Sequence, residues 1–167
     1  LWRIIAIIEI IPTLNKDLTD LISKIKDLGY KVKLDTNGTN PEMLKNLIED
    51  NLIDYVAMDV KNSLEKYSLT SGCSGFLTKN VEKSIKLLKS NVIDYEFRTT
   101  LVAGHHTTSS IIDLGALLNG SKRIYLQRFV ESENCLTFGL KGMSKPEAEK
   151  FKLILEEFIQ EVKLRGY

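Results

Sequence analysis

Two acidic residues and a nearby lysine are the side chains in this sequence best placed to do chemistry. Asp35 opens the run Asp-Thr-Asn-Gly, and Asp59 is followed two residues later by Lys61. Carboxylates can bind a cation through oxygen or hold an amino group. A lysine ammonium can bind a carboxylate or a phosphate as a point charge. The three residues therefore predict a binding site for a small charged ligand.

The local pattern places both acids at the ends of strands. Val32 and Leu34 alternate with lysines, which is the period of a strand, and an apolar run leads into Asp59. Asn40 and Pro41 then supply an N-cap and a first helical residue. In α/β folds the carboxyl ends of strands carry the active groups. The alternative is that these acids only cap strand ends or form salt bridges, since such loops often carry Asp and Asn as turn residues.

The rest of the chain alternates strand and helix patterns in the same way. Five strands are predicted near residues 4–10, 31–34, 55–58, 95–102 and 123–129, and the tail 162–167 favours a further short strand. Helices are predicted over 16–28, 41–50, from 78 or 80, over 111–118, and after the capping box formed by Ser144 and Glu147. This alternation predicts an α/β fold with a parallel sheet, either a barrel or an open doubly wound sheet.

Composition excludes several classes of function. The chain has 167 residues, 43% hydrophobic, with a net charge of +1, so we expect one domain and neither a nucleic-acid nor a membrane partner. No apolar run approaches the roughly 20 residues of a membrane span. The two cysteines, Cys73 and Cys135, are far apart and form no CxxC pair, which fits a reducing cytoplasm.

Several segments, taken together, resemble a known family. They are Leu34-Asp35-Thr36-Asn37-Gly38, Tyr55 to Lys61, Tyr95-Glu96-Phe97-Arg98-Thr99-Thr100, Tyr125-Leu126-Gln127-Arg128-Phe129 and Val162-Lys163-Leu164-Arg165-Gly166, in this order. The chain resembles the radical S-adenosylmethionine activating proteins from about Pro12 to its end. The similarity is strongest to the group that activates anaerobic ribonucleoside-triphosphate reductase, and pyruvate formate-lyase activating enzymes are more distant relatives.

The resemblance implies a fold, two cofactors and a partner. The fold is an incomplete parallel (β/α) barrel of the radical-SAM type with about five strands in this chain. In the family, a [4Fe-4S] cluster cleaves S-adenosylmethionine reductively, and the resulting 5′-deoxyadenosyl radical takes a hydrogen atom from a glycine of a glycyl-radical enzyme. The partner implied here is anaerobic ribonucleotide reductase. The cofactor-binding residues implied are Asp35, Thr36, Asn37, Gly38, Asp59 and Lys61, beside the methionyl group and an associated cation.

The chain also departs from the family pattern. The CxxxCxxC loop that binds three irons through thiolates is absent, so we expect residues 1–167 to form a single, N-terminally truncated radical-SAM domain without its first β/α unit. The family's GGEP motif aligns with Glu9-Ile10-Ile11-Pro12, where only the proline is kept. Ala103 stands where relatives often have proline. We therefore expect no cluster on this chain, no catalytic or metal-binding residues of its own, and no activity from it alone.

Two alternatives remain open at this point. The chain could be a non-catalytic module that keeps an S-adenosylmethionine or nucleotide pocket. It could also be an unrelated α/β phosphate-binding domain, although it contains no GxGxxG or Walker pattern. Arg98 and Gln127 are predicted to reach the same rim from later strands. The pair His105-His106 is interpreted as loop polarity rather than as a metal site.

Overall fold

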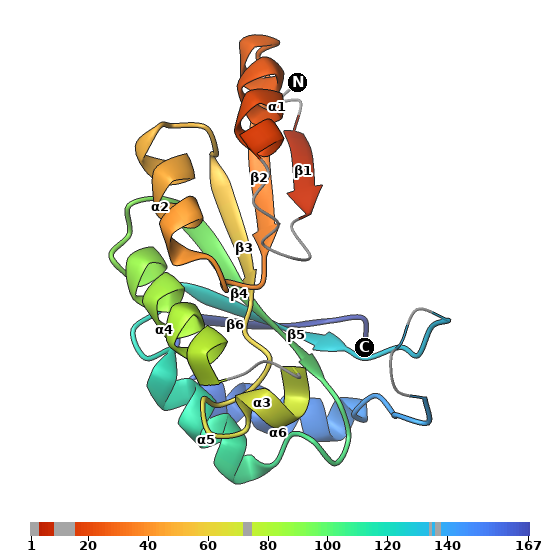
Figure 1. Cartoon of the computed structure of the whole chain (residues 1–167). Coiled ribbons are helices and arrows are strands. Elements are labelled where there is room, and N and C mark those ends of the chain that lie inside the picture. Colours follow the sequence, from red (N-terminus) through yellow and green to blue (C-terminus); the bar gives the residue numbers. More distant parts are fainter. Residues whose placement is uncertain (1–3, 9–15, 72–74, 134, 136–137) are drawn as a thin grey trace. The chain divides into compact units, whose positions relative to one another are not determined.

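The computed structural model describes residues 4–8, 16–71, 75–133, 135 and 138–167, which form alternating strands and helices (Figure 1). The strands follow the order β1-β2-β3-β4-β5-β6, and the pairings of β1 with β2, β2 with β3, β4 with β5 and β5 with β6 are all parallel. The elements are β1 (Ile4–Ile8), α1 (Lys16–Asp27), β2 (Lys31–Thr36), α2 (Pro41–Glu49), β3 (Tyr55–Asp59), α3 (Tyr67–Ser71), α4 (Gly75–Lys89), β4 (Asp94–Leu101), α5 (Thr108–Leu117), β5 (Arg123–Arg128), α6 (Lys145–Leu155) and β6 (Glu161–Arg165). The predicted α/β class and sequential parallel order are confirmed.

Two compact units make up the chain. Unit 1 comprises Leu1–Val60 and Gly75–Glu96, and unit 2 comprises Lys61–Ser74 and Phe97–Tyr167. Each is described below by itself. The expectation of a single truncated domain stays a prediction.

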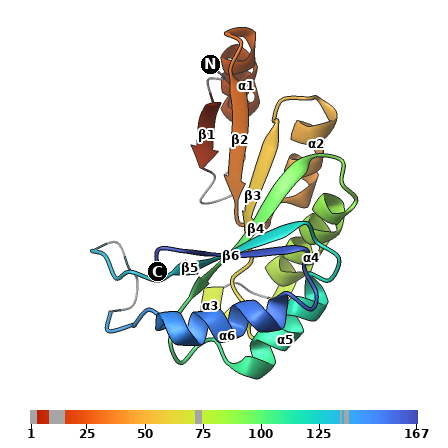
Figure 2. The same cartoon turned by 180° about the vertical axis from the view of Figure 1, so that it is seen from behind.

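In unit 1 the strands separate apolar and polar side chains onto opposite faces. Val32, Leu34 and Thr36 of β2 are buried, whereas the intervening Lys33 and Asp35 are partly exposed. Successive side chains of a strand point to opposite faces, so one face of β2 is apolar and the other is polar. Helices α2 and α4 contact each other, as both views show (Figures 1 and 2). Their buried residues include Leu44, Leu47, Val81, Ile85 and Leu88.

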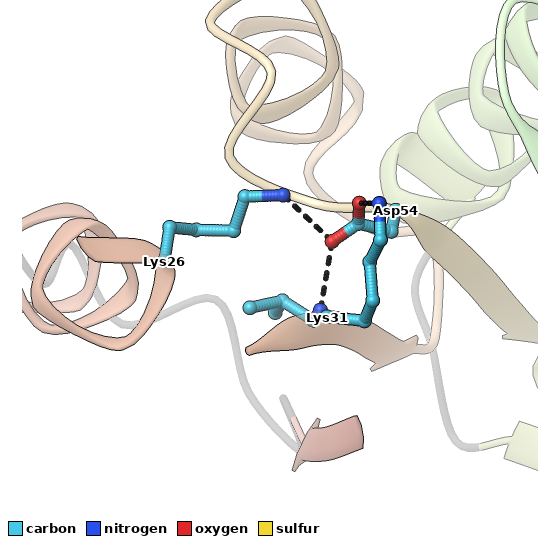
Figure 3. Close-up of polar contacts among 4 residues, drawn as sticks. Lys26, Lys31 and Asp54 are labelled. Carbon is cyan, nitrogen blue, oxygen red and sulfur yellow. Dashed lines mark hydrogen bonds and ion pairs between the residues drawn. The ribbon is translucent and has the colours of Figure 1, made fainter. Parts of the chain in front are cut away.

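A carboxylate just before β3 ties together α1, β2 and the start of β3 (Figure 3). Asp54 accepts hydrogen bonds from Lys26 Nζ of α1 and Lys31 Nζ of β2, each at 2.7 Å, and from the Val32 amide at 2.8 Å. Burial raises the pKa of Asp54, but the hydrogen bonds from Lys26 and Lys31 and from the Val32 amide outweigh it and lower the pKa to about 2. This carboxylate fixes the amino-terminal end of β2 against β3.

In unit 2 the helices pack on one another and on the last strand. Helix α5 contacts α6, and α6 contacts β6. The Phe158 ring occupies the space that a β-carbon at Gly115 would need, so a glycine there allows close packing. The capping box of Ser144 and Glu147 is confirmed at the start of α6. A second box, formed by Thr107 and Ser110, begins α5.

Several element boundaries differ from the sequence prediction. Strand β2 continues through Asp35 and Thr36, which the sequence had assigned to the following loop. Thr36 lies on the buried face, and its β-branched side chain suits a strand. Helix α4 begins at Gly75, earlier than predicted, and the tail forms β6 as a sixth strand. Residues 9–12, which align with the GGEP motif, and Cys73 lie outside the described residues.

Candidate functional site

Asp35 and Asp59 lie toward the same end of two neighbouring parallel strands. The register pairs Asp35 with Ala57 and Thr36 with Met58, and Asp59 is the next residue of β3. Both acids are partly exposed, on the sheet face opposite the buried Val32 and Leu34 in β2 and Val56 and Met58 in β3. The expectation that the two acids share one end of the sheet is therefore confirmed within unit 1.

Asp35 carries a basic neighbour on its own strand. Lys33 Nζ lies 2.7 Å from Asp35 Oδ1, and 12% of the Asp35 side chain is exposed. The contact is an ion pair between two residues that lie on the same face of β2. An ionised carboxylate has several acceptor positions, so Asp35 can accept a further hydrogen bond from a ligand.

The loop after β2 is built by its own side chains. Thr36 Oγ1 accepts from the Gly38 amide at 3.1 Å, and Asn37 Oδ1 accepts from the Thr39 amide at 3.0 Å and from the Thr39 hydroxyl at 2.7 Å. Asn40 Oδ1 then accepts from the Met43 amide and caps α2. Thr36 and Asn37 thus have a structural role that the sequence did not assign to them, and their role toward a ligand stays a prediction.

Gly38 allows this loop to sit close to unit 1's core. Its φ is +73°, and a β-carbon at this position would run into Met58 Cε and lie 3.0 Å from Met58 Sδ. Its carbonyl accepts from the buried Ser84 hydroxyl at 2.8 Å, and Asn80 Nδ2 donates to the Thr39 carbonyl at 3.0 Å. Helix α4 therefore holds the loop through these two hydrogen bonds, which restrain the chain at the end of β2.

Lys61 belongs to unit 2, two residues after the end of β3, and its backbone is held by a buried histidine. The Nε2 atom of His106 lies 2.9 Å from the Lys61 carbonyl oxygen, and His106 is only 3% exposed. The interpretation of His106 as loop polarity is wrong, because its ring is buried and joins two loops. Sequence reasoning also missed Asn62, which is fully buried. Nothing in the sequence near either residue indicates these contacts, which depend on residues distant in the chain.

Other residues considered in the sequence lie elsewhere. Arg98 pairs in register with Tyr125, and Thr100 with Gln127, so Gln127 lies two residues nearer the carboxyl ends than Arg98. In unit 1 a pocket of about 490 Å³ is lined by Lys31, Val32, Lys33, Asp54 and Tyr55, toward the amino ends of β2 and β3. The predicted site residues do not line this pocket.

The residues present do not fit an iron–sulfur cluster. The 167 residues include two cysteines, whereas a cluster bound by the CxxxCxxC loop needs three thiolates. Of the two, Cys135 lies in the described part of the chain and is free. No group of three or more His, Cys, Asp or Glu residues in that part could hold a metal ion. We therefore assign no cluster-dependent reaction step to the residues of this chain.

Comparison with known proteins identifies the family. The chain is 34% identical over 161 residues to the "Putative glycyl-radical enzyme activating enzyme MJ1227" of Methanocaldococcus jannaschii, covering 92% of this chain and 67% of that protein. The chain belongs to the radical S-adenosylmethionine activating-enzyme family. No protein-family profile matches it. The activating-enzyme resemblance seen in the sequence is thus confirmed at the level of the family.

Solved structures support the fold of this radical-SAM family member. A domain of pyruvate-formate lyase-activating enzyme from Bacteroides vulgatus has a TM-score of 0.71 at 14% identity, covering 90% of this chain and 91% of that one. A radical SAM methyltransferase from Sphaerobacter thermophilus has a TM-score of 0.62 at 14% identity, covering 83% and 43%. At these identities the likeness concerns the fold alone, and it agrees with a radical-SAM partial barrel. Among the described helices none has the length and apolar character to cross a membrane.

Proposed function

We propose that this chain is part of an activator of a glycyl-radical enzyme and that it contributes the residues that bind S-adenosylmethionine. The observation that carries the proposal is the placement of Asp35 and Asp59 at the carboxyl-end side of adjacent parallel strands, in a chain of the activating-enzyme family. The relative's name supports a glycyl-radical enzyme as partner. The sequence resemblance supports anaerobic ribonucleotide reductase as that enzyme, in the cytoplasm.

The proposed roles follow from charge. The carboxylates of Asp35 and Asp59 would hold the ammonium of the methionyl group or an associated cation, since both are anionic and partly exposed. Lys61 would hold the methionyl carboxylate as a point charge. Thr36, Asn37 and Gly38 would shape the rim, because their loop is fixed by its own hydrogen bonds.

S-adenosylmethionine, when bound, supplies the adenosyl group from which the family makes its radical. The residues of this chain would bind and orient that ligand, and the electron would come from a cluster whose thiolates these 167 residues do not contain. We propose that the chain alone is inactive in reductive cleavage. The cysteine count also favours a second candidate, a module that binds S-adenosylmethionine without catalysis.

Equilibrium dialysis with radiolabelled S-adenosylmethionine tests the binding proposal. Asp59→Asn and Lys61→Met should each weaken binding about tenfold, because each removes a charge that faces an opposite charge on the ligand. Lys83→Met, on the exposed face of α4, is the matched control and should leave the affinity unchanged. Equal affinities for all of these proteins would refute the assignment of the site.

Adding a purified glycyl-radical enzyme tests the partner proposal. Anaerobic ribonucleotide reductase should retain this chain in an anaerobic pull-down, whereas pyruvate formate-lyase should not. If only pyruvate formate-lyase retained this chain, the proposed partner would be wrong and the family assignment would still stand.

A further inference from the structure

The segment that follows β3 is fastened to the loop that follows β4 by buried side chains of unit 2. His106 uses both ring nitrogens: Nε2 lies 2.9 Å from the Lys61 carbonyl oxygen, and Nδ1 accepts from the Val102 amide at 3.1 Å. A carbonyl can only accept, so Nε2 carries the proton and Nδ1 is the acceptor. With Nδ1 accepting from the Val102 amide the imidazole is neutral, and Nδ1 also lies 3.3 Å from the Val102 carbonyl oxygen.

Asn62 makes a second connection between the same two segments. Its Nδ2 donates to Thr70 Oγ1 at 2.9 Å and to the His105 carbonyl at 3.2 Å, and its Oδ1 accepts from the Ser63 amide at 2.8 Å. The side chain is fully buried. Each polar group of this amide therefore has a partner, as burial requires.

A buried network of this kind selects one geometry. Hydrogen bonds specify where each backbone atom lies, and an apolar side chain of similar shape would leave the bonded backbone groups without these partners. Burial lowers the pKa of His106 below its ordinary value, which agrees with a neutral ring, whereas the nearby carbonyl oxygens of Lys61 and Val102 act in the opposite direction. The atoms fixed by the network include the Lys61 carbonyl and the amide of Ser63, two residues further on.

We infer that His106 and Asn62 are positioning residues for Lys61. They fix the backbone of Lys61 in one conformation. The Lys61 ammonium can then bind the methionyl carboxylate of S-adenosylmethionine without a prior change in the backbone. The inference rests on the proposed function, since it assumes that Lys61 binds this ligand. A displacement of about 1 Å in such a support is enough to weaken a site markedly.

A matched pair of variants separates positioning from general stability. His106→Gln places an amide near Nε2 and keeps a donor for the Lys61 carbonyl, whereas His106→Asn places its amide near Nδ1 and keeps an acceptor for the Val102 amide. Each variant loses one of the two hydrogen bonds, so we expect similar losses of stability. The dissociation constant for S-adenosylmethionine is measured for both, together with the ¹³C chemical shift of the Lys61 carbonyl.

The expected result is asymmetric. His106→Asn should weaken S-adenosylmethionine binding about tenfold and shift the Lys61 carbonyl signal, as losses of supporting hydrogen bonds do at ligand sites. His106→Gln should stay within about threefold of the wild type. If Lys61→Met weakens binding but the two His106 variants bind equally, the positioning inference is overturned while the proposed function stands. If Lys61→Met binds as the wild type does, the ligand role of Lys61 is refuted, and the inference is overturned with it.

Discussion

The Nε2 atom of His106 lies 2.9 Å from the carbonyl oxygen of Lys61, a residue 45 positions earlier in the chain. The Nδ1 atom of the same ring accepts from the Val102 amide at the end of the strand pair β4–β5. One buried side chain thus connects Lys61, the second residue after β3, to Val102, the first residue after β4. Since the carboxyl ends of strands carry the ligand sites of α/β folds, this contact lies where rigidity matters for binding.

Removing the His106 ring should destabilise the protein. His106→Leu would leave the Lys61 carbonyl and the Val102 amide without the partners they have now, at an expected cost of about 2–4 kcal/mol in the free energy of unfolding. Urea unfolding followed by circular dichroism measures this. His105→Leu is the control and should change the free energy by no more than about 0.5 kcal/mol. Equal losses for the two variants would show that the hydrogen bonds of His106 contribute little.

The same ring should make stability fall in mild acid. Burial lowers the pKa of folded His106 below its ordinary value of 6.5, so the unfolded chain takes up the proton first as the pH drops. The unfolding free energy should therefore decrease as the pH falls below about 6.5, with a slope of up to about 1.4 kcal/mol per pH unit. His106→Gln should remove this slope between pH 7 and 5.5, and His105→Gln should keep it. A slope unchanged in His106→Gln would contradict the neutral buried ring.

Asp54 should stabilise unit 1 above acidic pH. Its pKa is lowered from 3.8 to about 2, so its contribution is present above pH 4 and is lost as the pH falls through about 2. Asp54→Asn should cost about 1 kcal/mol at pH 7, a value reduced for solvent screening because a fifth of the side chain is exposed. Asp50→Asn, at an exposed site, is the control. Chemical denaturation at pH 7 and pH 2.5 measures both, and the difference between Asp54→Asn and wild type should shrink at the lower pH.

Two glycines with similar backbone angles should respond differently to alanine. Gly38 and Gly29 have φ of +73° and +80°, so alanine at either costs about 1 kcal/mol of backbone strain. At Gly38 the new methyl group also meets Met58, whereas nothing lies within 4 Å of a β-carbon at Gly29. Gly38→Ala should therefore lose about 1–2 kcal/mol more than Gly29→Ala in thermal or urea unfolding. Equal losses would mean that Met58 moves aside without cost.

The sequence predicted the architecture well because each feature that sets a helix or strand here involves only a few neighbouring residues. Alternation in β2, the Asn40-Pro41 helix start and the Ser144–Glu147 capping box are each set by a few neighbouring residues, and the structure confirms all three. Placement of Asp35 and Asp59 at one sheet end follows from the handedness and parallel order of successive β-α units. These features do not depend on distant contacts.

The missed features depend on contacts between distant residues. Nothing near His106 in the sequence indicates that its ring reaches Lys61, and nothing near Asn62 indicates its bond to the His105 carbonyl. The extension of β2 through Asp35 and Thr36 depends on pairing with Ala57 and Met58, which the sequence of β2 alone does not contain. Local polarity favoured a loop at Asp35 and Thr36, and pairing with β3 made them part of the strand.

Anaerobic iron–sulfur reconstitution of the 167-residue chain, followed by iron counting and assay of 5′-deoxyadenosine after reduction with S-adenosylmethionine, tests the central claim most directly. Our account assigns S-adenosylmethionine binding to this chain and the cluster thiolates to residues that it does not contain. It predicts no stoichiometric [4Fe-4S] cluster and no 5′-deoxyadenosine above a protein-free control. A reducible cluster that yields 5′-deoxyadenosine from this chain alone would contradict it.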